Sequence, residues 1–186
     1  MGTSTSWIAI EGMNLEQLGD ALGLAPAPTH GTNDGTQLPH LAAMLPTGWV
    51  LLVRRLERDG LVADRELLAQ LSRSSRVVGC DEESHVMYSA CSEWRDGREV
   101  WAVIHAADEA QDHLATRGDL PAGWTAARDE SLTSQARSGQ DVDYIFEIPL
   151  AVAKLVVGYR LESDDDDALD YVTLLRRPPK PWWRFW

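Results

Sequence analysis

Residues 84–105 read SHVMYSACSEWRDGREVWAVIH, and this stretch decides the fold. Two runs rich in β-branched and aromatic residues flank a short polar segment centred on Asp96 and Gly97. An Asp-Gly pair favours a type I′ turn, because both central residues of that turn need a positive φ. The pattern therefore predicts an antiparallel β-hairpin. The expected cross-strand pairs are Trp94 with Glu99, Ser92 with Trp101, and Ala90 with Val103.

In this register one face of the hairpin is expected to be buried. That face carries Trp94, Trp101, Val103 and Tyr88, and the opposite face carries Met87, Cys91, Val100 and Ile104. Since both faces hold apolar residues, neither is clearly exposed to water.

Outward from the hairpin, helical and strand patterns alternate. Further strands are predicted at 7–11, 49–56, 76–80, 144–148 and 169–175, the last of these at a sheet edge. Helices are predicted at 15–22, 64–72, 121–138 and 149–159, and residues 25–40 read as a long surface loop. This order predicts an α+β fold, with a mostly antiparallel sheet, a central β-hairpin and about four helices packed on it. Residues 1–175 form one predicted domain.

The hairpin and the segments after it also carry a resemblance. The succession SEWRDGREVWAVIH, HL, GDLP, VDYIFEIPLAVA and GYR, within about residues 49–160, resembles a group of small bacterial α+β proteins with no assigned activity. The resemblance implies a bacterial, cytoplasmic origin and implies no catalytic activity.

Charge divides the chain unevenly. Its net charge is −12, and residues 76–175 alone hold 21 acidic and 8 basic side chains. So acidic a body disfavours binding to a nucleic-acid backbone, which needs a basic surface. The acidic runs Asp81, Glu82 and Glu83, and Asp164, Asp165, Asp166 and Asp167, are predicted to lie in a turn and a loop. They are either a solvated surface or a surface that attracts a cationic protein partner.

The last eleven residues form a basic, aromatic tail. Three prolines favour an extended chain there, and Trp182, Trp183, Phe185 and Trp186 alternate with cations. Three interpretations remain open: the tail covers a groove of its own domain, lies at a membrane interface, or docks on another protein. In each case these four aromatic side chains are expected to be buried.

Catalytic motifs are absent from the sequence. It has no nucleophile elbow, no phosphate-binding loop and no compact metal-ligand spacing, so neither cofactor nor metal is expected. Cys80 and Cys91 are expected to be free, inert thiols that face each other across neighbouring strands, in a cytoplasmic protein without a secretory signal. His85, His105 and His113 are most simply polar residues at strand ends.

These observations favour a non-enzymatic protein-binding domain. A bacterial immunity-type protein, which neutralises a toxin partner through an acidic surface, is one instance of this class. One alternative is an enzyme or small-ligand binder with a dispersed pocket near the three histidines. The other is a peripheral membrane adaptor that uses the aromatic tail.

Overall fold

The predicted hairpin is part of a larger sheet, but it lies near one edge of that sheet and not, as was expected, at its centre. The computed structural model describes residues 4–27, 40–55, 64–138, 142–161 and 168–177. Among these residues the strands are β1 (Ser4–Glu11), β2 (Leu24–Pro26), β3 (His40–Met44), β4 (Trp49–Arg55), β5 (Val77–Glu83), β6 (Tyr88–Arg95), β7 (Arg98–Ala106), β8 (Ala115–Gly118) and β9 (Val172–Arg176). The helices are α1 (Leu15–Leu22), α2 (Arg65–Leu71), α3 (Trp124–Ser138) and α4 (Glu147–Val157).

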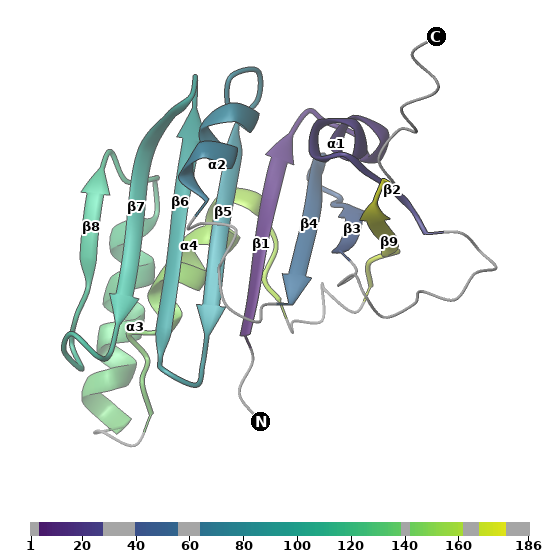
Figure 1. The fold of residues 1–186 in the computed structure, drawn as a ribbon. Coiled ribbons are helices and arrows are strands. Elements are labelled where there is room, and N and C mark those ends of the chain that lie inside the picture. Colours follow the sequence, from purple (N-terminus) through teal and green to yellow (C-terminus); the bar gives the residue numbers. More distant parts are fainter. Residues whose placement is uncertain (1–3, 28–39, 56–63, 139–141, 162–167, 178–186) are drawn as a thin grey trace, which may run out of the picture.

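All nine strands belong to one sheet in the order β2-β9-β3-β4-β1-β5-β6-β7-β8, and every pairing is antiparallel. Helices α1 and α2 lie on one face of the sheet, and α3 and α4 lie on the other (Figure 1). The α+β fold with a mostly antiparallel sheet and four helices is therefore confirmed.

Each sheet face buries its own hydrophobic cluster. Ile8, Leu52 and Val77 pack with apolar residues of α1 and α2. On the other face, Trp7 and Leu51 pack with the apolar side of α4. Strand residues alternate between the faces, so one strand supplies both clusters. This alternation makes the sheet the middle of three layers.

The turn of the hairpin is as predicted, and the register beyond it is different. Asp96 and Gly97 have φ values of 52° and 74°. Trp94 does oppose Glu99, but Trp101 then opposes Glu93, which leaves Val100 as an extra residue of β7. Such a β-bulge shifts every later pair by one residue.

The bulge separates the tryptophans that were expected to share a face. Trp94 packs in the α1–α2 cluster, and Trp101 packs in the α4 cluster beside Cys91 and Val103. The predicted pairs Ser92–Trp101 and Ala90–Val103 are wrong, because Ser92 opposes Ala102 and Ala90 opposes Ile104. On each side of the bulge, successive side chains still alternate between the two faces of the sheet.

Several predicted element boundaries also need correction. β2, β3 and β8 are short strands that the sequence analysis did not predict, and β9 lies between β2 and β3 instead of at an edge. The predicted strand at 144–148 is wrong: residues 147 and 148 begin α4, and before them the Asp143 side chain accepts hydrogen bonds from the backbone N–H groups of Ile145 and Phe146. These bonds form a turn that leads into α4.

Candidate functional site

The first predicted acidic run is part of the sheet and does not form an exposed turn. Asp81, Glu82 and Glu83 end strand β5, which pairs with β1 on one side and β6 on the other. Asp81 is buried and accepts a hydrogen bond from the Ser6 hydroxyl, while Glu82 and Glu83 are half-buried. Pairing on both sides satisfies the backbone and outweighs the turn-like composition. The reversal follows at residues 84–87.

The second acidic run and the tail lie outside the described residues. This applies to Asp164, Asp165, Asp166 and Asp167, and to Trp182, Trp183, Phe185 and Trp186. Their proposed roles in partner binding and docking therefore stay predictions. Within the described part of the chain, no helix is long and apolar enough to cross a membrane.

Two of the three histidines lie together. The ring centroids of His105 and His113 are 6.5 Å apart, whereas His85 is exposed in the turn between β5 and β6. The ring of His105 is 0% exposed. Its Nδ1 lies 2.7 Å from the carbonyl oxygen of His113, and its Nε2 lies 3.0 Å from Oδ2 of Asp143. Asp143 comes from a segment 38 residues later in the chain.

The contacts of His105 define its protonation. A carbonyl oxygen only accepts hydrogen bonds, so Nδ1 carries a proton and donates. Nε2 meets the Asp143 carboxyl group, so both ring nitrogens have a hydrogen-bond partner. The pair thus joins β7 to the residues that lead into α4.

Two further contacts fix this junction. Ser89, opposite His105 on β6, donates its hydroxyl hydrogen to the carbonyl oxygen of Phe146 at 2.7 Å. The Phe146 ring meets the His105 ring edge to face, with centroids 6.5 Å apart. Because both nitrogens of His105 are engaged and Ser89 bonds elsewhere, these residues do not form a nucleophile and its general base.

His113 is also held by its neighbours. Its Nδ1 accepts a hydrogen bond from the backbone N–H of Ala106 at 3.0 Å, and its Nε2 lies 3.3 Å from a carboxylate oxygen of Glu109. The described residues contain no group of three or more His, Cys, Asp or Glu side chains placed to hold a metal ion.

Cys80 and Cys91 face each other across β5 and β6, as predicted, and both are free and buried. Burial raises the pKa of the Cys80 thiol well above its ordinary value, and a hydrogen bond with Cys91 adds to this effect. Because the thiolate is the reactive form, the environment disfavours nucleophilic chemistry at Cys80.

We expect both thiols of the native protein to react with Ellman's reagent at neutral pH at least about a hundred-fold more slowly than those of the unfolded chain, since reaction requires local opening. Absorbance at fixed reagent concentration, with and without denaturant, measures the ratio. Native labelling of either thiol at the unfolded rate would contradict the assignment.

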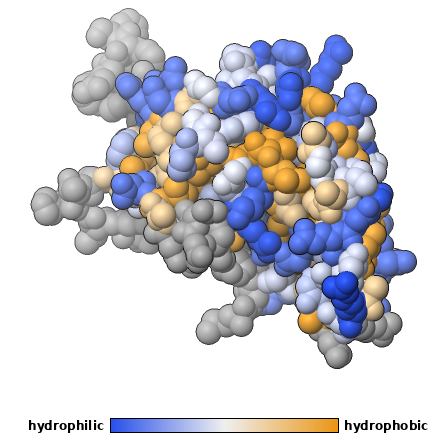
Figure 2. Space-filling model, turned by 180° about the vertical axis from the view of Figure 1, so that it is seen from behind, coloured by the Kyte–Doolittle hydropathy of each residue, from blue (hydrophilic) through white to orange (hydrophobic). Residues whose placement is uncertain are grey.

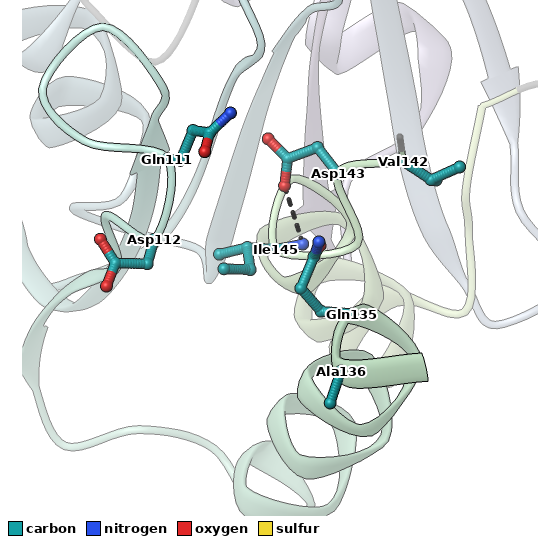
Figure 3. Close-up of a pocket in the computed structure, with 7 residues that line it drawn as sticks. All are labelled: Gln111, Asp112, Gln135, Ala136, Val142, Asp143 and Ile145. Carbon is teal, nitrogen blue, oxygen red and sulfur yellow. Dashed lines mark hydrogen bonds between the residues drawn. The ribbon is translucent and has the colours of Figure 1, made fainter. Parts of the chain in front are cut away.

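An open pocket lies beside the junction of His105 and Asp143. Its volume is about 370 Å³. Gln111 and Asp112, from the connection between β7 and β8, lie across from Asp143 (Figure 3). Gln135 and Ala136 of α3, together with Val142 and Ile145, complete the lining. We call this the Asp143 pocket.

A larger hollow of about 880 Å³ lies between α3 and α4. We call it the α3–α4 groove. Its lining includes Ala127, Glu130 and Ser134 of α3, Ala151 and Leu155 of α4, and Val142. Val142 and Asp143 line both hollows, so the pocket and the groove adjoin at these two residues.

The groove is open to solvent because the residues of its walls are only partly buried. No residue of α3 is buried, although Trp124 and Ala127 pack partly against the α4 cluster. Val142 is 48% exposed and Leu155 is 53% exposed. Figure 2, which views this side, shows hydrophobic residues in the middle of the face with hydrophilic residues around them.

The two histidines were candidates from the sequence, whereas the residues that line the hollows were not. Gln111, Asp112, Gln135, Val142 and Asp143 lie on three separate segments of the chain. One signal was present in the sequence: the predicted helix at 121–138 has no continuous apolar stripe, and such a helix is seldom buried.

No family model, curated protein or solved structure matches this chain.

Proposed function

We propose that this chain is a protein-binding domain whose partner docks on the α3–α4 groove. The observation that supports it is a large hollow between α3 and α4 with the exposed apolar residues Val142 and Leu155 in its lining. Val142 lies where the groove meets the Asp143 pocket, and Leu155 lies on α4 beside Gly123. Hydrophobic residues exposed around a concave surface are typical of protein interaction sites.

The shape of the groove suits a peptide segment of a partner. Its α3 wall is built from small residues such as Ala127 and Ser134, spaced so that they fall on one helix face. Small side chains allow a partner chain to approach the helix backbone closely. An amphipathic helix or an extended segment that buries apolar residues against Leu155 fits this geometry.

The charge around the groove favours a cationic partner. Asp108, Glu109 and Asp112 are exposed on the connection after β7, and Glu130 lines the groove. Two basic residues, Lys154 and Arg160, also line the groove, and Arg160 pairs with Glu147. Acidic steering, first expected from the run at Asp81, is therefore proposed here for a different surface, and its main effect is on association rate. A bacterial immunity-type protein remains one instance of this class.

The substitution Leu155→Asp tests the proposal. Placing a carboxylate on the apolar wall should weaken partner binding at least about ten-fold, as loss of an interface anchor does. The fold should persist, since Leu155 is half-exposed. Tagged protein would capture the partner from cells of the source organism, and calorimetry with the purified partner would measure affinity.

Leu132→Asp is the matched control, because Leu132 is an exposed leucine of α3 that does not line the groove. Binding should be lost with Leu155→Asp and retained with Leu132→Asp. Equal affinity of wild type and Leu155→Asp for every captured protein would contradict docking in the groove.

A further inference from the structure

The Asp143 pocket offers hydrogen-bond acceptors on two walls. Gln111 and Asp112 lie on the wall formed by the β7–β8 connection, where the Gln111 amide turns toward Asp143 and the Asp112 carboxylate turns to the other side (Figure 3). Between these groups, Val142 and Ile145 add apolar surface. Among the described residues that line this pocket, none is basic. A ligand that fits must donate hydrogen bonds in two directions and also present an apolar part.

Asp143 is held in place as an acceptor. Its Oδ1 accepts from the N–H groups of Ile145 at 3.0 Å and Phe146 at 3.1 Å, and its Oδ2 meets His105. A carboxylate has about four lone-pair positions, so one on Oδ2 stays available to a ligand. The His105 ring is fully buried behind Asp143, whose side chain is 20% exposed. His105 is thus a positioning residue for this carboxyl group.

Exposed charge adds to the preference. Asp108 and Glu109 precede the pocket residues on the same connection, and both are exposed. Asp112 and Asp143 are the two acidic residues of the pocket lining. The surroundings therefore favour a cation over a neutral or anionic group.

We infer that the Asp143 pocket binds the guanidinium group of one arginine side chain of the protein partner. A guanidinium has five N–H donors in a plane, so it reaches acceptors on two walls at once, which the compact ammonium of lysine does less well. The alkyl stem of the arginine lies along Val142. This inference rests on the proposed function, because Val142 and Asp143 connect the pocket to the groove.

The test uses a probe that needs no partner. Nα-acetyl-arginine methylamide is titrated into the full chain, and amide chemical shifts of residues 111–112, 135–136 and 142–145 are followed by NMR. The matched neutral probe is the citrulline derivative, which has the same shape and no charge. We expect the arginine probe to bind at least about ten-fold more tightly than the citrulline probe, because charge-assisted hydrogen bonds are about twice as strong as neutral ones.

Variants locate the site. Asp112→Asn should weaken binding of the arginine probe several-fold, while Asp108→Asn, which removes the same charge from an exposed position that does not line the pocket, should weaken it clearly less. Asp143→Asn should abolish binding, with circular dichroism and a melting curve to show whether it folds. If Asp143→Asn does not fold, Asp112→Asn against Asp108→Asn decides the question alone.

Three outcomes overturn the inference: no shifts at the pocket amides, equal binding of both probes, or equal losses in Asp112→Asn and Asp108→Asn. A lysine probe that binds more tightly than the arginine probe also overturns it. Failure here is distinct from failure of the proposed function. Leu155→Asp should abolish partner binding and leave binding of the arginine probe intact. If the probe does not bind but the partner still depends on Leu155, the arginine inference fails and the proposed docking in the groove stands.

Discussion

Replacement of Gly118 by alanine is expected to lower the free energy of unfolding by at least about 3 kcal/mol, because the new side chain meets both backbone strain and a steric clash. Gly118 has a φ of 72°. A Cβ atom there would lie 1.9 Å from the carbonyl oxygen of Val100 and 2.9 Å from its carbonyl carbon. These neighbours are backbone atoms of β7, which cannot rotate away.

Urea unfolding of Gly118→Ala, followed by tryptophan fluorescence, measures this loss. The matched control is Gly12→Ala, since Gly12 has a φ of 73° and, apart from its chain neighbours, no described residue comes within 4 Å of the added Cβ. Left-handed strain alone should cost Gly12→Ala about 1 kcal/mol. If both variants lose the same stability, the close approach of β8 to β7 contributes nothing and the expectation is wrong.

The close contact between Gly118 of β8 and Val100 of β7 lies at the β-bulge. Val100 is the extra residue at the bulge, and its carbonyl oxygen accepts a hydrogen bond from the N–H of Asp119 at 3.2 Å. Gly118 lies opposite Trp101 in the β7–β8 register. A residue without Cβ therefore lets the end of β8 close over the bulge and the buried Trp101.

Removal of the Glu93 side chain should have an effect of similar size. Glu93 is 1% exposed, and its carboxylate accepts hydrogen bonds from Arg76, Arg95 and the indole N–H of Trp101. Glu93→Ala leaves the buried indole N–H and part of the Arg76 guanidinium without an acceptor. We expect a loss of about 3 kcal/mol, near the lower end for a broken buried ion pair because Arg95 is half-exposed.

The same carboxylate should make stability depend on pH. Burial raises the pKa of Glu93, but hydrogen bonds from Arg76 and Arg95, together with their charges, outweigh burial and leave the pKa below its ordinary value of 4.5. A carboxyl group with a lowered folded-state pKa stabilises the fold above the unfolded pKa. Its contribution is therefore full at neutral pH and is lost as the pH falls from about 4.5 through the folded-state value.

Urea unfolding between pH 7 and pH 3 tests both expectations. Wild-type stability should fall in the acid range, and Glu93→Gln should lose stability at pH 7 while showing a smaller fall with acid. Glu99→Gln is the control, because Glu99 pairs with the exposed Arg65 and Arg117. It should cost about 1 kcal/mol or less. Identical pH profiles for Glu93→Gln and wild type would refute the role of Glu93.

Local chemistry made the hairpin turn predictable, and the lack of a local signal for the bulge explains the wrong register beyond the turn. Asp96 and Gly97 mark the turn because few other residues adopt a positive φ readily. The bulge at Val100 has no comparable local signal, since valine is an ordinary strand residue. Its position depends on the approach of Gly118 and on the burial of Glu93 against Trp101.

Local composition also gave a wrong prediction for the run Asp81, Glu82 and Glu83. Three acidic residues are typical of a turn, yet two neighbouring strands pair with this segment and the Ser6 hydroxyl bonds to Asp81. Ser6 and strand β1 are far from the run in sequence, and β6 is a separate strand. Composition alone could not reveal them.

The sequence by itself determined the α+β class, the hairpin turn and the helix that Asn14 caps at α1, because each depends on residues within a few positions of one another. Tertiary structure decided the order of nine strands, the face on which each tryptophan lies and the hollows beside Asp143. Asp143 meets His105 across 38 residues, and the groove forms where α3 and α4 pack on one end of the sheet. Such contacts depend on how distant segments close together, and no short pattern records that geometry.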